Sequence, residues 1–208
     1  MTQRTQDFSR LCDDFLGNAL DPKWVAETAA ASVEMQGNAA ALILTAAAGR
    51  AGLHLGDKLP FPIDDIDHFE CRLKFTPAAG DHLDAGSNLV FGLAAAHNDD
   101  PDAIVASCGF KIVGGASLIA CESNDGVINL DDVSTNRNLT KDVYKRFRIT
   151  LTRGKNRIRF DAGGEQVATA TVFNMSAYAG NLQPYVMLSG AVADRVDIDY
   201  IQVVARRH

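Results

Sequence analysis

Strict alternation between apolar and charged side chains is the feature that most constrains the fold of this chain. In residues 68–75 every second residue is apolar and the residues between are charged or polar, and residues 146–152 and 157–161 repeat this pattern. A period of two places alternate side chains on opposite faces of a β-strand. We therefore expect half-buried strands, and the side chains expected to point into the core are Phe69, Leu73, Phe75, Phe147, Ile149, Leu151, Ile158 and Phe160.

Turn-forming residues separate the strand-like segments along the whole chain. Residues 153–156 and the pair Gly163-Gly164 connect residues 146–152, 157–161 and 166–173 into a predicted three-stranded antiparallel meander. The pair Gly114-Gly115 lies between two apolar segments and indicates a hairpin turn, not a phosphate-binding loop.

Further strands are expected elsewhere, and their number indicates the fold class. They are residues 25–31, 40–46, 88–96, 104–113, 116–122, 184–189 and 195–204. Alanine is frequent in residues 25–31, which leaves a helix there as the alternative. More than ten short strands separated by turns are typical of a two-sheet sandwich or jelly roll, and 208 residues suit a single domain of that kind.

Both ends of the chain carry motifs of a known superfamily. The opening motif is Asp13-Asp14-Phe15 followed by Leu20-Asp21-Pro22-Lys23-Trp24, and the closing motif is the segment 196–203, VDIDYIQV. Together they resemble the concanavalin A-like lectin/glucanase superfamily. The resemblance implies an all-β, antiparallel two-sheet jelly roll over residues 11–208, with the first and last strands in one sheet. Residues 1–10 are expected to form a flexible N-terminal arm. The superfamily includes hydrolases, lectins, laminin G-like modules and virion proteins, so the fold alone does not give the function.

The motifs of catalysis are missing from the sequence. Glucanases of this superfamily carry acids spaced as ExDxxE or ExDxE on one strand, and no such triplet occurs here. Asp197 and Asp199 come nearest, but we expect them to be solvent-facing charges on the last strand. The histidines, which are His54, His68, His82, His97 and His208, form no HxH or HExxH unit. We therefore predict no catalytic, cofactor-binding or metal-binding residues, and a protein that is not an enzyme.

Two aspartate-rich segments and the cysteines allow alternative interpretations. Residues 64–67 and 98–102 offer oxygen atoms that suit Ca²⁺, but aspartate and asparagine also form turns with their own backbone, and we favour turns. Four scattered cysteines permit two disulfides, yet no secretory feature accompanies them, and free buried thiols are favoured. The single tryptophan, Trp24, is expected to pack in the core and not to stack on a sugar.

Charge is distributed unevenly along this acidic chain. The net charge of −6 argues against nucleic acid as a partner. One hairpin is nevertheless basic, and alternation places Arg146, Arg148, Arg157 and Arg159 on its outer face. This candidate interaction face suits an acidic protein, a phosphate-bearing partner or a sulfated glycan. The alternative is a solvated face that prevents edge-to-edge aggregation, and we favour that alternative.

The expected function follows mainly from the missing motifs. Residues 1–10 contain no apolar signal segment, and no apolar stretch approaches the roughly 20 residues that span a bilayer. We expect synthesis in the cytoplasm and no membrane partner. The first hypothesis is a structural or assembly protein, a capsid decoration (cement) or minor virion protein of a tailed bacteriophage, that forms a homo-oligomer or binds the capsid shell. The alternative is a carbohydrate-binding module or a receptor-binding virion protein, and an atypical glycoside hydrolase ranks third.

Overall fold

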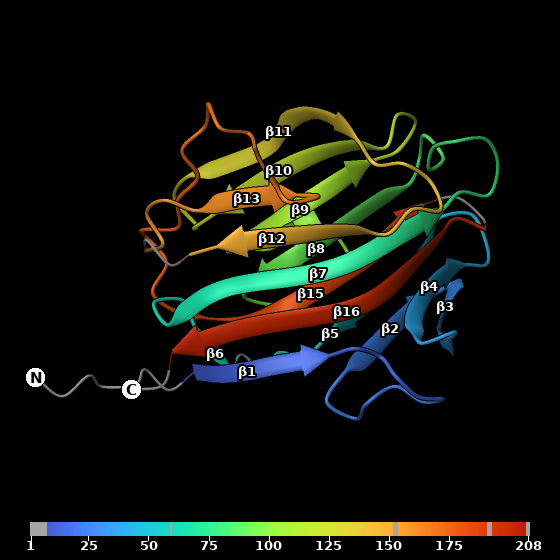
Figure 1. Ribbon diagram of the computed structural model, residues 1–208, viewed down its shortest axis with the longest axis horizontal. Helices are drawn as coiled ribbons and strands as arrows, with labels where there is room; N and C mark the ends of the chain where they lie inside the picture. The colour runs from blue at the N-terminus through green and yellow to red at the C-terminus, as the bar shows by residue number, and fades with distance from the viewer. Residues whose placement is uncertain (1–7, 59, 152–153, 191–192, 207–208) are drawn as a thin grey trace, which may run out of the picture.

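Two antiparallel β-sheets pack face to face in the computed structural model, which describes residues 8–58, 60–151, 154–190 and 193–206 (Figure 1). This is the expected concanavalin A-like jelly-roll sandwich. The predicted arm is only partly covered by the structure. Residues 1–7 lie outside the described residues, whereas residues 8–10 begin a strand and do not belong to an arm. They pair with the last strand, starting at Phe8 opposite Arg206, because that strand offers a free edge there.

Sheet A contains both ends of the described chain. Its strands run in the order β14-β13-β12-β7-β16-β4-β3, and β1 pairs with the second half of β16, next to β4 along the same edge. Their bounds are β1 Phe8–Asp13, β3 Ala31–Gln36, β4 Ala39–Leu44, β7 Ile66–Thr76, β12 Lys145–Thr150, β13 Arg159–Ala162, β14 Glu165–Val167 and β16 Arg195–Arg206. The first and last strands therefore meet in one sheet, as the resemblance implied, and β12, β13 and β14 form the predicted meander.

Sheet B lies behind sheet A in Figure 1 and has the strand order β11-β10-β9-β8-β15-β5-β2, with β6 paired to the start of β15. Their bounds are β2 Val25–Ala29, β5 Gly49–His54, β6 Phe61–Pro62, β8 Asn88–Ala94, β9 Ser107–Val113, β10 Leu118–Asn124, β11 Asn129–Asn138 and β15 Asn181–Gly190. Residues 25–29 are thus extended, not helical. A short 3₁₀ helix, η1 (Pro101–Ala103), lies in the segment between β8 and β9.

The core between the sheets is built from the inward positions of the alternating strands. All eight side chains predicted to face inward are at most 5% exposed. Five phenylalanines form a chain of ring contacts that joins the sheets, and they are Phe91, Phe110, Phe147, Phe160 and Phe173. Trp24 is buried against Phe15 and donates a hydrogen bond from Nε1 to Asp13, so the packing role expected for it is confirmed.

Some local expectations need correction. The third strand of the meander ends at Val167 and does not reach Phe173, because Ala168 adopts a left-handed backbone with φ of 50°. Phe173 instead makes one isolated bridge to Ile158. All four cysteines are free, as expected, and three of them are buried while Cys12 is exposed. Among the described residues, no helix is long and apolar enough to cross a membrane.

Candidate functional site

The outer face of sheet B is crossed by the segment that connects β8 and β9. Alternate residues along each strand lie on this face, and in the middle of the sheet these residues are small, including Gly92 on β8 and Gly109 on β9. The connecting segment, residues 95–106, lies over them, and its Ile104 is buried against Ala94, Tyr185 and Met187. A Cβ atom at either glycine would meet the backbone of the neighbouring strand, so these positions require glycine, and the crossing segment divides the outer face into two polar regions.

Hydrogen bonds and an ion pair fix the crossing segment to the sheet. Asp99 forms an ion pair with Arg50 of β5 at 2.7 Å. The Tyr185 hydroxyl donates to the backbone carbonyl of Asn98 at 2.8 Å. Within the segment, the side chains of Asn98 and Asp100 accept hydrogen bonds from the backbone N–H groups two residues further on. The aspartate-rich segment 98–102 therefore uses its side chains for turns, as expected.

A polar cleft of about 150 Å³ lies on one side of the crossing segment. We call it the His54 cleft, and it is lined by Glu27, Thr28, Ala29, Arg50, Gly52, His54, Asp99, Tyr185 and Met187. Gly52 forms part of its floor, paired across the sheet with Glu27 on β2 and Met187 on β15. The cleft is smaller than the roughly 300–1,000 Å³ of typical small-molecule sites, so it suits one compact polar group.

His54 is the most unusual side chain of the cleft. Its side chain is only 3% exposed, and its Nε2 atom is buried with no hydrogen-bond partner, 3.7 Å from Oε2 of Glu27. Its other nitrogen, Nδ1, accepts a hydrogen bond from the backbone N–H of Gly56 at 3.0 Å. Burial, followed by the neighbouring His97, lowers the pKa of His54 from its ordinary value of 6.5. The ring is therefore neutral at pH 7, and because Nδ1 accepts, its proton is on Nε2.

His97 stacks on His54 and is oriented by a carboxylate. The two rings lie 4.2 Å apart between centroids and are tilted by only 9°. Nδ1 of His97 is 2.7 Å from Asp57, which also accepts hydrogen bonds from the His97 backbone and from Gln183. Partial burial acts to raise the pKa of Asp57, but these hydrogen bonds outweigh it and lower that pKa. The ionised Asp57 holds the Nδ1 proton of His97, and Nε2 of the same ring lies 3.6 Å from Glu27, where it is an acceptor in the neutral form of the ring.

Two histidines and a glutamate are residue types that also bind metal ions. The nitrogen and oxygen atoms offered by Glu27, His54 and His97 lie within 4.8 Å of one another. A metal on Nε2 of His54 would require the proton on Nδ1, where it would face the Gly56 N–H group. Two nearly parallel rings also cannot both aim their in-plane lone pairs at one ion. The geometry therefore favours hydrogen bonding over metal binding.

A cluster of acidic side chains around one lysine occupies the other side of the crossing segment. Nζ of Lys111 on β9 lies 3.0 Å from Asp132, 3.4 Å from Glu122 and 3.7 Å from Asp102. Burial raises the pKa of Glu122 to about 8, against the opposing effect of Lys111. Asp131 also approaches Glu122 and Asp102. Lys111 is one cation among four carboxyl groups, and its ion pairs connect β9, β10, β11 and η1.

The predicted arginine face lies on sheet A, on the opposite side of the molecule. Arg146, Arg148 and Arg159 line a hollow of about 270 Å³ together with Asp161. Arg157 does not lie on a strand as predicted, because it belongs to the turn before β13 and lines a neighbouring hollow. Arg159 forms an ion pair with Asp161, and Arg148 lies 3.8 Å from Glu70. Acidic partners thus alternate with the arginines, which weakens the positive field of this face.

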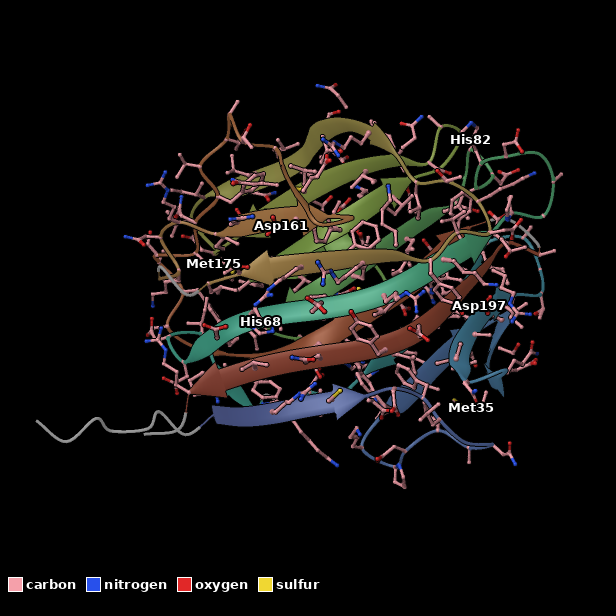
Figure 2. The ribbon with its side chains drawn as sticks, viewed as in Figure 1. Met35, His68, His82, Asp161, Met175 and Asp197 are labelled. Atoms are coloured by element: carbon pink, nitrogen blue, oxygen red, sulfur yellow. The ribbon has the colours of Figure 1, made fainter. Side chains whose placement is uncertain are left out.

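The acids of the last strand belong to the same outer face. Figure 2 looks onto it and shows Asp161, His68 and Asp197 on β13, β7 and β16. Asp197 is not solvent-facing as predicted: it is 4% exposed, and ion pairs with Arg195 and Lys74 cover it. Asp199 pairs with Arg72 at 2.8 Å. Both side chains are engaged in cross-strand ion pairs, which agrees with a structural role.

Sequence reasoning missed the His54 cleft because its residues are distant in the chain. Glu27, His54 and His97 come from β2, β5 and the crossing segment, and no motif connects them. The histidines were expected to be dispersed, yet the pairing of β5 with β15, and of β15 with β8, brings two of them into contact. Only the sheet order, which is not visible in the sequence, carries this information.

Comparison with known proteins identifies the fold. Searches with family models and against curated proteins found no match. Solved structures do match. The Emp47p carbohydrate recognition domain is 14% identical with a TM-score of 0.67, and the match covers 100% of both chains. The endo-1,3-β-glucanase of Streptomyces sioyaensis is 15% identical with a TM-score of 0.65, covering 99% of this chain and 98% of that one. The potassium-bound Emp46p carbohydrate recognition domain is 13% identical with a TM-score of 0.61, covering 87% and 88%. The fold is shared with both lectin domains and glucanases.

Proposed function

We propose that this chain is a carbohydrate-binding domain that holds its ligand in the His54 cleft without hydrolysing it. The observation that carries the proposal is the cleft itself, a small polar hollow on the outer face of a rigid sheet. Its donors and acceptors are held in place by β-strands and by the fixed crossing segment, and such preorganisation favours specific binding. The shared fold with carbohydrate recognition domains is compatible with this function.

The chemistry of the cleft matches that of sugar hydroxyl groups. A hydroxyl both donates and accepts hydrogen bonds, and the cleft offers carboxylates, a guanidinium and an imidazole within a small volume. Tyr185 is 4% exposed and Met187 is 5% exposed, so neither presents a ring or a broad apolar surface to a ligand. Recognition would therefore rest on polar contacts, and aromatic stacking would contribute little.

The central strands of sheet B also support binding at the His54 cleft without hydrolysis. Retaining glycosidases place two carboxyl groups about 5–5.5 Å apart on either side of the bond they cleave. The outward positions of the central strands β8, β9 and β15 carry no carboxylate between the cleft and Glu122, and they include Val90, Gly92, Ala94, Gly109, Lys111, Tyr185 and Met187. Glu122 itself is next to the Lys111 ammonium. At the cleft itself these positions favour binding. Carboxyl groups within 4.8 Å of one another do occur on the other side of the crossing segment, in Asp102, Glu122 and Asp131 around Lys111, so hydrolysis is tested together with binding.

The virion assembly role expected from the sequence stays a prediction. Its candidate contact face carries Asp161 and Glu70 among the arginines, which reduces the charge available for an acidic partner. The His54 cleft contains a more specific arrangement of polar groups, and for that reason glycan binding is the function proposed here.

A substitution that fills the cleft tests the proposal. A Cβ atom added at Gly52 would lie 3.5 Å from the Val186 carbonyl oxygen and 3.9 Å from Met187, which is ordinary contact, so Gly52→Leu should fold normally and occupy the floor of the cleft. On a glycan array we expect the unchanged protein to bind and Gly52→Leu to lose at least about tenfold in affinity, since the displaced ligand loses its hydrogen bonds.

Gly86→Leu is the matched control, because Gly86 does not line the cleft and a Cβ atom there meets only the Asp84 side chain, at 3.6 Å. Thermal unfolding confirms that both variants fold. If the unchanged protein binds no glycan, or if Gly52→Leu binds as well as Gly86→Leu, the proposal is wrong. Release of reducing sugar from a bound glycan would contradict binding without hydrolysis.

A further inference from the structure

We infer that the ligand of the His54 cleft is an uncharged sugar, and that the group formed by Glu27, His54 and His97 binds two neighbouring hydroxyls of it. This inference rests on the function proposed above and adds the chemical class of the ligand. It begins from the buried Nε2 of His54, which has no hydrogen-bond partner in a side chain that is 3% exposed. Buried polar atoms of proteins are nearly always paired, so an unpaired donor that faces a cleft indicates a missing acceptor.

The tautomers define what each imidazole offers to a ligand. The Gly56 N–H group holds the lone pair of Nδ1 in His54, so Nε2 of His54 is a donor. The Asp57 carboxylate holds the Nδ1 proton of His97, so in the neutral form of the ring Nε2 of His97 is an acceptor. The Glu27 carboxylate lies between them, 3.7 Å from the first Nε2 and 3.6 Å from the second.

These distances fit bridging hydroxyls. Hydrogen bonds to oxygen are about 2.7–3.2 Å long, so one oxygen atom can be within reach of both His54 and Glu27 across their 3.7 Å gap. A hydroxyl there accepts from His54 and donates to Glu27. A second hydroxyl on the adjacent carbon donates to His97. Only a ligand group that both accepts and donates hydrogen bonds can satisfy all three side chains. A carboxylate or sulfate only accepts, so it has no proton to donate to Glu27 or His97.

The charge around the cleft disfavours anionic sugars. Glu27, Asp57 and Asp99 place three carboxylates near the ligand position, and Arg50, the guanidinium among them, already pairs with Asp99. An acidic ligand would meet like charge at short distance, which is costly in a partly buried site. Sialylated, sulfated and uronic glycans should therefore bind more weakly than neutral glycans of the same length.

Glu27→Gln tests the assignment without disturbing the fold, because this side chain is 47% exposed. Glu165→Gln, at an exposed carboxylate on sheet A, is the matched control. The probes are a neutral oligosaccharide and its uronic counterpart, measured by calorimetry. We expect the unchanged protein and Glu165→Gln to prefer the neutral probe, and Glu27→Gln to bind it about tenfold more weakly, since a hydrogen bond to a charged carboxylate is replaced by a weaker one to a neutral amide.

The failures of the two proposals are distinguishable. If no glycan of any class binds the unchanged protein, the proposed function fails and this inference fails with it. If glycans bind but Glu27→Gln has no effect, or the uronic probe binds more tightly than the neutral one, only the inference is wrong. A Zn²⁺ titration gives a further readout. Micromolar binding of Zn²⁺ that is lost in His54→Gln would show that the three side chains form a metal site and would overturn the hydroxyl assignment.

Discussion

At the scale of single residues, His54 is a buried polar side chain whose hydrogen-bonding capacity the protein itself does not fully satisfy. Its ring is buried, neutral and in contact with His97, and one of its nitrogens is unpaired. Such a group lowers stability unless a ligand satisfies it, because an unpaired buried donor loses its hydration without compensation. Its retention within a polar cleft is the reason for assigning it to ligand binding.

The pKa of His54 makes a prediction about stability. Burial lowers that pKa below 6.5 in the folded protein, while Glu27 and Asp57 oppose this effect. As the pH falls through about 6.5, the unfolded chain takes up the proton before the folded protein does, so the free energy of unfolding must decrease. We expect His54→Gln to remove part of this decrease between about pH 7 and pH 5, measured by urea denaturation, with the exposed His82→Gln as control. Parallel pH profiles for the unchanged protein and His54→Gln would contradict this account.

At the scale of elements, the contact between the sheets depends on phenylalanines supplied by strands from both. Phe147 of β12 in sheet A lies with its ring 4.8 Å from Phe91 of β8 and 5.0 Å from Phe110 of β9, both in sheet B. Edge-to-face contacts of this kind add to the effect of burial. These ring contacts therefore support β8 and β9 on the inner side of sheet B, opposite the face that the crossing segment covers.

Truncation of Phe147 tests this contact between the sheets. The side chain is fully buried, so Phe147→Ala should lower the free energy of unfolding by about 3–5 kcal/mol, whereas Val172→Ala, at a position that is 65% exposed, should change it by less than about 0.5 kcal/mol. Chemical denaturation measures both. Equal effects of the two substitutions would show that the ring contacts are not the main link between the sheets.

The elements also show which features can be predicted from the sequence. Alternation in β7, β12 and β13 places Phe69, Phe147 and Phe160 correctly, because a period of two depends only on local sequence. It fails at Ala168, where a left-handed residue ends β14, and at Asp197, which neighbouring cations cover. The cleft could not be predicted, since it depends on which strands are neighbours. That order is set by the global packing of the sheets and has no local signature.

At the scale of the whole molecule, the two outer faces differ in character. Sheet A presents cross-strand ion pairs such as Arg72 with Asp199, which neutralise one another. Sheet B presents the crossing segment with the His54 cleft on one side and the Lys111 cluster on the other. The expected assembly into an oligomer or onto a capsid stays a prediction, and it places partners on sheet A, leaving sheet B open for a glycan.

Nuclear magnetic resonance of the histidine rings tests the central claim most directly. Long-range ¹H–¹⁵N spectra distinguish Nδ1 from Nε2 and can be followed while a neutral oligosaccharide is added. We predict saturable shifts of the Nε2 resonances of His54 and His97, with His68 and His82 unchanged, since His54 lines the cleft and His97 stacks on it. Unchanged His54 and His97 resonances, with backbone shifts gathered around Arg146 and Arg148, would place the ligand on sheet A and contradict the account.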